Sequence, residues 1–154
     1  MIPINVAIVG CGRISDLHEL GYHGRKDARI IAVCDVKRSN GVEKAKAWGV
    51  SRIYTDYQDV LDDPEIGMVE LLVPHHLHCK MTVQACEAKK HVSVQKPMAL
   101  NAGQADEMIA AAKRNKVQLR VYETFVFYPP AVKAKELMDE GAIGRPQMIR
   151  AHVN

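Results

Sequence analysis

The sequence predicts a doubly wound α/β fold, in which helices cover both faces of a parallel sheet. Short apolar stretches that suit buried strands alternate along the chain with longer stretches that suit helices. Right-handed crossovers between parallel strands then distribute the helices over both faces. At 154 residues, with 47% hydrophobic and 25% charged residues, the chain has the size and balance of an ordinary globular domain.

The first half of the chain provides three of the predicted strands. An apolar run over residues 4–9 is followed by a glycine turn and a segment through residue 22 that suits a helix. A second apolar run follows, and then a helix that Gly49 closes. The expected elements are therefore strand 4–9, strand 29–34, helix 40–48, a minor strand 53–54 and a short helix 56–61.

The second half continues the alternation, with strand 68–73, helix 79–88, strand 91–94, helix 102–115 and strand 117–121. The residues at two helix ends differ in how well they suit a left-handed conformation. Asn115 suits a left-handed C-terminal cap, because asparagine tolerates that conformation. Lys89 stands at the corresponding place after the earlier helix, where a positive φ would cost a lysine about 1 kcal/mol relative to glycine.

The character of the chain changes after residue 121. Aromatic residues gather at Phe125, Phe127 and Tyr128, Pro129 suits a helix start, and glycines at 141 and 144 suit its end. Residues 147–153 alternate weakly, as a strand would. We therefore expect a dinucleotide-binding domain at 1–122, for reasons given below, and at 123–154 a linker helix and the first strand of a missing C-terminal substrate domain.

Composition excludes several classes of protein. No apolar run approaches the roughly 18 residues that a bilayer requires, and the N-terminus lacks the order of a signal peptide. The net charge is +3, with lysines and arginines scattered among acids, so neither a membrane nor a nucleic acid is an expected partner. Four cysteines without a CxxC pair are expected to be free thiols in a reducing, cytoplasmic compartment.

The loop after the first strand is the first candidate site. Its sequence is Gly10-Cys11-Gly12-Arg13-Ile14-Ser15, which resembles G-x-G-x-x-G in the strand–loop–helix context that gives this motif meaning. Gly10 permits the tight turn, and Gly12 lets the backbone approach a pyrophosphate at a helix N-terminus. Residues 10–14, Cys11, Arg13 and Ile14 included, are thus predicted to bind a dinucleotide. Ser15 replaces the third glycine, and Cys11 is expected to be a passive thiol.

Asp35 ends the second strand, twenty residues after Ser15. An acid at this position can accept hydrogen bonds from the adenine-ribose 2′-hydroxyl, and it repels a 2′-phosphate. This favours NAD, although Lys37 and Arg38 keep NADP open. The alternative is that Asp35 caps the next helix and that the glycines only make a turn.

Three histidines follow the strand that ends near Val73, in the stretch Pro74-His75-His76-Leu77-His78. A zinc site needs converging ligands at fixed distances, and no such set of cysteines or histidines is evident, so no metal is expected. The alternatives are a solvent-facing loop or a loop that lines the cofactor crevice. The second interpretation makes Val73, Pro74, His75 and His78 cofactor-binding residues.

Gln95, Lys96 and Pro97 end the strand VSV abruptly. Ligands of open parallel sheets bind outside the carboxyl ends of the strands, so Gln95 and Lys96 are expected to share one edge with the glycine loop and Asp35. A lysine beside a nicotinamide could bind hydroxyls and stabilise an alkoxide, which makes Lys96 the catalytic candidate. The alternative is a surface lysine before a turn-forming proline.

Several ordered motifs together resemble one family. The stretches VAIVGCGRIS, AVCD, LLVPHHLH, KHVSVQKPMAL and VYETFVFYPPAVKAKELMDEGAIGRP are similar to the N-terminal half of the Gfo/Idh/MocA oxidoreductases. The resemblance implies a Rossmann domain that binds NAD(P), a second domain with substrate residues and oligomer contacts, and oxidation or reduction of sugars and polyols. It places Lys96 beside the nicotinamide, as the lysine of a Glu-Lys-Pro motif.

The chain departs from the family pattern at several positions. Gln95 stands where the family has glutamate, His75 where it has asparagine, and the stretch around Thr124 and Val126 lacks the common Asn and Arg. We expect an NAD(P)-dependent dehydrogenase in the parent protein, with a homo-oligomer allowed, and an inactive chain in isolation. The alternatives are a stand-alone nucleotide-binding or interaction module and an S-adenosylmethionine methyltransferase.

Overall fold

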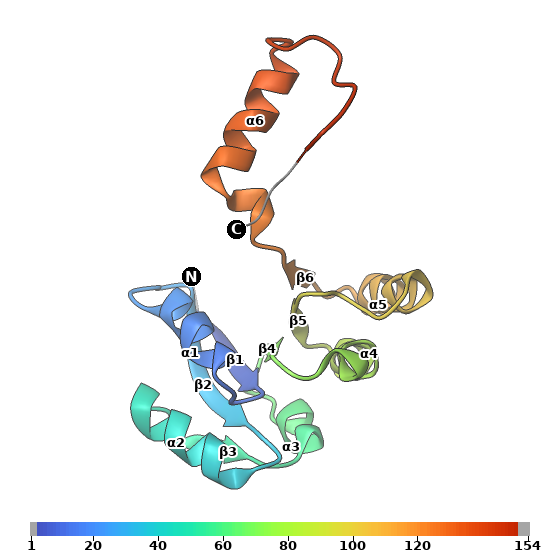
Figure 1. Ribbon diagram of the computed structural model, residues 1–154. Coiled ribbons are helices and arrows are strands. Elements are labelled where there is room, and N and C mark those ends of the chain that lie inside the picture. Colours follow the sequence, from blue (N-terminus) through green and yellow to red (C-terminus); the bar gives the residue numbers. More distant parts are fainter. Residues whose placement is uncertain (1–2, 151–154) are drawn as a thin grey trace. The chain divides into compact units, whose positions relative to one another are not determined.

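The strands pair in parallel in the order β3-β2-β1-β4-β5-β6, as a computed structural model describes for residues 3–150 (Figure 1). The predicted doubly wound α/β class is thus confirmed. The chain divides into two units, Met1–Tyr122 and Glu123–Asn154. The six strands of the first unit are β1 Ile4–Val9, β2 Ala28–Cys34, β3 Arg52–Tyr54, β4 Met68–Leu71, β5 His91–Gln95 and β6 Leu119–Tyr122.

Helices cover both faces of this sheet. Figure 1 shows α1 and α2 on one face and α3, α4 and α5 on the other. Successive β1 residues divide between the two layers, because side chains alternate along a strand. Ala7 and Val9 join the cluster that holds Met108 of α5, whereas Val6 and Ile8 join the one that includes Tyr22. The helical elements are α1 Ile14–Glu19, η1 Leu20–Tyr22, α2 Arg38–Trp48, α3 Tyr57–Asp62, η2 His75–Leu77, α4 His78–Glu87 and α5 Ala102–Asn115.

Helix ends follow the sequence expectation at Gly49 and depart from it at Asn115. Gly49 closes α2 at φ 68°. Lys89 has φ 61°, so the cost of a positive φ at a lysine applies here. The predicted cap at Asn115 is wrong, because α5 includes this residue and Lys116 takes the left-handed conformation at φ 57°. The Asn115 side-chain amide donates to the Ala111 carbonyl, one turn earlier in the helix.

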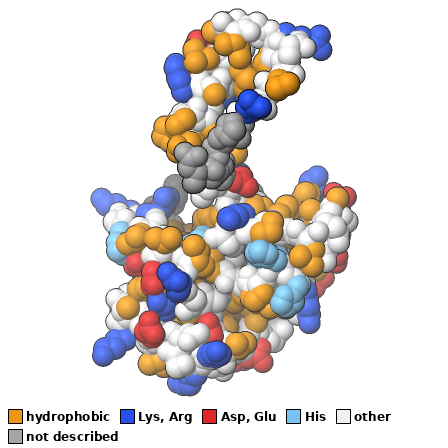
Figure 2. All heavy atoms as spheres, viewed as in Figure 1, with side chains coloured by type: hydrophobic (Ala, Val, Ile, Leu, Met, Phe, Trp, Pro, Cys, Tyr) orange, Lys and Arg blue, Asp and Glu red, His pale blue; other side chains and the backbone are white. Residues whose placement is uncertain are grey.

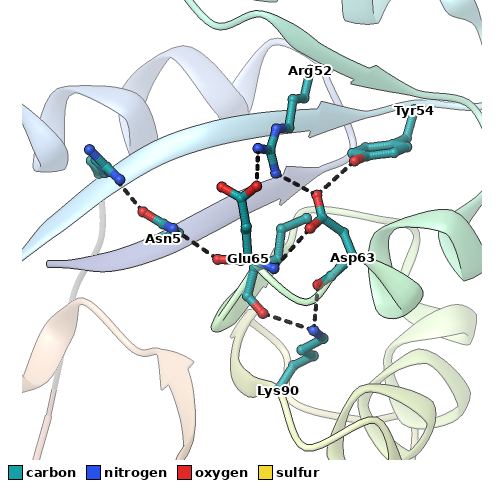
Figure 3. A network of polar contacts seen from close by, with 8 residues as sticks. Asn5, Arg52, Tyr54, Asp63, Glu65 and Lys90 are labelled. Atoms are coloured by element: carbon teal, nitrogen blue, oxygen red, sulfur yellow. Dashed lines mark hydrogen bonds and ion pairs between the residues drawn. The ribbon is translucent and has the colours of Figure 1, made fainter. Parts of the chain in front are cut away.

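A polar network stabilises the amino edge of the sheet (Figure 3). The Asp63 carboxylate accepts hydrogen bonds from Arg52 at 2.7 Å and from the Tyr54 hydroxyl at 2.8 Å. The buried Lys90 ammonium donates to the carbonyls of Asp63 and Ile66 at 2.7 and 2.9 Å. These contacts tie both ends of the short strand β3 and the start of β5 to the loop that leads into β4.

The second unit contains η3 Phe125–Phe127 and α6 Pro129–Asp139. Pro129 occupies the first turn of α6, as the sequence predicts, and an ion pair joins Lys135 to Asp139 one turn later. Residues 147–150 are irregular backbone, whereas a strand was predicted for 147–153, and 151–154 lie outside the described residues. No helix within residues 3–150 is long and apolar enough to cross a membrane.

Candidate functional site

The glycine loop begins where β1 meets the end of β4. Gly10 has φ 98°, and a Cβ at this position would lie 2.3 Å from the backbone oxygen of Leu72. Only glycine fits, because both the backbone conformation and the approach of β4 exclude a side chain. At Gly12 an added Cβ would meet no atom within 4 Å, so this position opens toward free space. Gly10 is therefore required by the backbone of the turn, whereas Gly12 leaves open space beside the backbone.

Ser15 occupies the third position of the glycine motif. It is fully buried, and its hydroxyl donates to the carbonyl of Gly12 at 2.6 Å. The Ser15 side chain thus bonds back into the loop. Arg13 and Ile14 lie exposed where the loop enters the short helix α1. The Ser15 hydroxyl thus bonds the loop internally, whereas Gly12, Arg13 and Ile14 are exposed.

Asp35 lies against the glycine loop at the end of β2. One carboxylate oxygen accepts a hydrogen bond from the backbone N–H of Cys11 at 2.9 Å. The other accepts from the backbone N–H of Lys37 at 2.8 Å and from the Asn40 amide at 3.3 Å. A single acid therefore organises the loop and also holds Lys37, the N-cap residue of α2, although the helix start has no side-chain cap of its own.

Cys11 is a buried thiol in this loop. Its sulfur contacts the Cys34 carbonyl oxygen at 3.6 Å. Burial first, and then the Asp35 charge, raises the pKa of the Cys11 thiol to about 12. A thiol whose pKa is raised in this way is a poor nucleophile at neutral pH.

His78 joins the ends of two neighbouring strands. Its buried ring lies with Nδ1 at 2.9 Å from the Pro97 carbonyl oxygen and Nε2 at 2.9 Å from that of Val73. Carbonyl oxygens only accept, so both bonds form at once only when both ring nitrogens carry a proton. The Lys96-Pro97 peptide bond is cis. His78 thus lies between the residue after Lys96 and the end of β4, and it can bond both only as a cation.

Of the other residues in this histidine stretch, Pro74, His75 and His76 are exposed and Leu77 is half-buried. Pro74 and His75 lie at the surface, and the His75 ring meets the His78 ring edge-on at a centroid distance of 5.5 Å. No group of three or more His, Cys, Asp or Glu residues in the described part of the chain could hold a metal ion. The stretch borders the edge on which the glycine loop also lies.

Lys96 is exposed at the carboxyl end of β5. Its backbone N–H donates to the side-chain oxygen of Gln95 at 2.7 Å. No acidic side chain within residues 3–150 forms an ion pair with its ammonium. The ammonium is therefore available to a ligand at this edge.

A buried polar network lies behind Lys96, and the sequence interpretation did not find it. Glu70 on β4 is fully buried, and its carboxylate contacts His18 Nδ1 at 2.5 Å and accepts a hydrogen bond from the Tyr22 hydroxyl. The Tyr122 ring packs edge-on against His18 at a centroid distance of 4.4 Å. His18 Nε2 in turn lies 2.9 Å from the Gln95 amide nitrogen. The sequence did carry one signal for this network, namely the acidic Glu70 inside the apolar run of β4.

The predicted site residues converge because β1, β2, β4 and β5 are parallel. Their carboxyl ends carry the glycine loop, Asp35, the Val73 to His78 stretch and Lys96, all at one edge of the sheet. The order of strands reverses between β1 and β4, where open α/β sheets bind their ligands. The donors, open backbone and acid at this edge fit a dinucleotide.

An apolar groove lies elsewhere in the first unit. It has a volume of about 610 Å³ between α5 and the outermost strand β6, and Met98, Ile109, Leu119 and Val121 contribute to its lining. None of the predicted site residues lines it. Acidic and basic side chains are interspersed on the visible face of this unit, where no broad basic patch appears (Figure 2).

Comparisons with known proteins agree with this geometry. Residues 4–123 match the oxidoreductase family with an NAD-binding Rossmann fold, GFO_IDH_MocA. Over 147 residues the chain is 31% identical to YrbE, an uncharacterised oxidoreductase of Bacillus subtilis, and 29% identical to the myo-inositol 2-dehydrogenase of Thermotoga maritima. Each alignment covers 96% of this chain, but only 43% and 44% of those relatives.

A solved structure shows the same relationship. The crystal structure of an NAD-binding oxidoreductase from Klebsiella pneumoniae superposes with a TM-score of 0.83 at 30% identity, over 94% of this chain and 40% of that chain. The match extends through the strands that carry the glycine loop, Asp35 and Lys96. The chain therefore belongs to the Gfo/Idh/MocA oxidoreductase family and carries its NAD-binding Rossmann domain.

Proposed function

We propose that this chain supplies the cofactor-binding domain of an NAD(P)-dependent oxidoreductase that transfers a hydride to or from a sugar or polyol. The observation that carries the proposal is the convergence of the glycine loop, Asp35 and Lys96 at one edge of the sheet. Family membership supports the cofactor, and the likeness to a myo-inositol 2-dehydrogenase supports a polyhydroxylated substrate.

Each part of this edge has a role in the proposal. The open backbone at Gly12 would approach the pyrophosphate, and the Asp35 carboxylate would accept hydrogen bonds from the adenine ribose. The His75 and His78 stretch would border the nicotinamide side. The bound nicotinamide supplies the hydride chemistry, and the protein supplies the orientation.

Lys96 is the proposed catalytic residue. Its exposed ammonium can donate to a substrate hydroxyl and stabilise negative charge as that oxygen becomes an alkoxide. The clamp of His78 on Pro97 and the bond of Gln95 to the Lys96 N–H hold the backbone on both sides of this residue. The backbone that presents Lys96 is therefore preorganised.

Residues 123–154 are proposed to begin a second, substrate-carrying domain. The exposed apolar side chains of Phe127, Met148 and Ile149, at 81%, 85% and 81% exposure, are consistent with such a continuation. The four buried free cysteines, Cys11, Cys34, Cys79 and Cys86, support a reducing cytoplasmic location.

Calorimetric titration of the chain with NAD, NADP and S-adenosylmethionine tests the proposal. We expect saturable binding of NAD, weaker binding of NADP because of Asp35, and no binding of S-adenosylmethionine. Binding of S-adenosylmethionine alone would overturn the proposed function in favour of the methyltransferase alternative.

A further inference from the structure

We infer that His18 and Glu70 are positioning residues for Lys96, that they act through the side-chain amide of Gln95, and that they do so while His18 is neutral. The inference rests on the proposed role of Lys96. It assigns a function to a buried carboxylate that lies behind the cofactor edge and that the fold alone does not require.

Three consecutive hydrogen bonds lead from the core to Lys96. Glu70 Oε1 contacts His18 Nδ1 at 2.5 Å, and His18 Nε2 contacts the Gln95 amide nitrogen at 2.9 Å. The Gln95 side-chain oxygen then accepts from the Lys96 backbone N–H at 2.7 Å. These residues lie on β4, α1 and the end of β5, so the path crosses between elements distant in sequence.

The Lys96 backbone fixes the direction of every bond in this path. A backbone N–H only donates, so the oxygen of the Gln95 amide must face it and the NH₂ group must face His18. His18 Nε2 must then accept, which leaves its proton on Nδ1, where it donates to Glu70. The arrangement therefore selects one tautomer of a neutral imidazole.

Two tyrosines accompany the pair of Glu70 and His18. Its second oxygen accepts from the Tyr22 hydroxyl, and Tyr122 lies beside His18. Burial first, and then the charge of Glu70, raises the pKa of both the Tyr22 and the Tyr122 hydroxyls, so both stay protonated. Within the described residues, Glu70 from β4 and Tyr122 from β6 contact His18, and Tyr22 from η1 contacts Glu70.

A second proton on His18 would break the path at its centre. His18 Nε2–H would then face the NH₂ group of Gln95, and two donors cannot bond. If the Gln95 amide rotates to offer its oxygen to His18, its NH₂ group faces the Lys96 N–H instead. Either way one bond is lost, and the Lys96 segment is held less firmly when His18 is protonated.

Gln95→Glu separates this mechanism from a general structural role. A carboxylate at position 95 can accept from the Lys96 N–H and from a protonated His18 at the same time. The variant should therefore remove the effect of acid on the Lys96 segment without deleting a core side chain. His23→Gln is the matched control, because His23 is an exposed histidine that pairs only with Glu19 among the described residues.

The experiment measures NADH affinity by nicotinamide fluorescence as the pH falls from neutral to mildly acidic values. Loss of one hydrogen bond in the path should weaken binding by about three- to tenfold in the unsubstituted chain and in His23→Gln. Gln95→Glu should lack this step, while any contribution of His75 and His78 remains in all three proteins. A step of equal size in Gln95→Glu would overturn the inference.

Histidine side-chain ¹⁵N NMR of the same chain provides an independent readout, with His18→Gln for assignment. We expect His18 to carry its proton on Nδ1 alone at neutral pH, and to carry two protons in Gln95→Glu. Protonation on Nε2 in the unsubstituted chain would overturn the inference. A chain that binds no NADH at any pH would overturn the proposed function, and the tautomer of His18 would still decide the positioning path.

Discussion

The Asp35 carboxylate accepts a hydrogen bond at 2.9 Å from the backbone N–H of Cys11, which joins the end of β2 to the loop that follows β1. Its other oxygen accepts from Lys37 at the start of α2. Asp35 therefore shapes the loop before any ligand arrives. The residue proposed to select the cofactor is thus also part of the loop that would bind it.

Replacing Asp35 with asparagine should shift cofactor preference. The amide removes the charge that repels a 2′-phosphate, so the ratio of NAD to NADP affinity should fall by about tenfold, or ~1.4 kcal/mol. Calorimetric titration with both dinucleotides measures the ratio. Asp16→Asn is the matched control, since Asp16 is an acid that pairs with Lys44. An unchanged ratio in Asp35→Asn would show that this acid does not face the ribose.

Alanine at the two loop glycines should have separable effects. Gly10→Ala forces a Cβ to 2.3 Å from Leu72 at a φ of 98°, so it should lower the free energy of unfolding by about 2 kcal/mol or more. Gly12→Ala meets no protein atom, so unfolding should change little, whereas NAD affinity should fall by about tenfold. Urea denaturation and titration distinguish the two. Unchanged NAD affinity in Gly12→Ala would contradict the proposed approach of the pyrophosphate.

Lys96→Ala should affect catalysis more than binding. In the complete enzyme that contains this domain, turnover should fall by about 10²-fold or more, because the charge on the developing alkoxide loses its partner. NADH affinity should fall by no more than about tenfold, since Asp35 and the glycine loop are unaltered. Steady-state kinetics and fluorescence titration measure the two effects. Lys113→Ala, at an exposed lysine in the last turn of α5, should alter neither.

The amino-edge network should make stability depend on acid. Burial by itself would raise the pKa of the Asp63 carboxyl, but bonds from the Glu65 N–H, the Tyr54 hydroxyl and Arg52 outweigh it and lower this pKa. The stabilisation is therefore present above the usual range of an aspartate and is lost as pH falls through the lowered value. Asp63→Asn should lower the free energy of unfolding by about 1–3 kcal/mol at neutral pH. It should also make this free energy depend less on pH in the acidic range.

Denaturation midpoints measured across the acidic range test this expectation. Asp62→Asn is the control, because this neighbouring acid is bonded only to the exposed Gln58 within the described structure. A steep acid limb that persists in Asp63→Asn would assign the pH dependence to other carboxyl groups.

The four cysteines should resist thiol reagents in the folded chain. All are buried, and burial raises the pKa of the Cys11 and Cys34 thiols to about 12. Reaction with a disulfide reagent at neutral pH should be slow until denaturant is added, when all four thiols react. Rapid modification of one thiol in the native chain would identify a local opening, most informatively at Cys11 in the glycine loop.

The sequence predicted the strands and the glycine loop because their signals are local. Apolar runs mark β1 and β4, and Gly10 and Gly12 stand at their positions directly after a strand. The switch from Asn115 to Lys116 at the end of α5 escaped prediction, because the choice depends on which residue's amide reaches back to Ala111. The position of a helix end can differ by one residue for reasons as small as a single hydrogen bond.

The path behind Lys96 could not be read from the sequence for a different reason. His18 lies 52 positions from Glu70 and 77 positions from Gln95 along the chain, so strand order and register bring them together. Glu70 was visible as an acid in an apolar run, but its partners come from α1, η1 and β6. The sequence can report that such a residue needs partners, whereas only the fold identifies them.

The two edges of this sheet carry different groups of side chains. Arg52, Asp63 and Lys90 anchor one edge, whereas Asp35 and Lys96 occupy the other. Tyr54 connects the two groups, because its hydroxyl donates to the Asp63 carboxylate and its carbonyl accepts from the backbone N–H of Asp35. Substitutions that share a partner need not have additive effects. Engineering of coenzyme choice at Asp35 should therefore follow thermal stability at Tyr54 and Asp63 in the same variants.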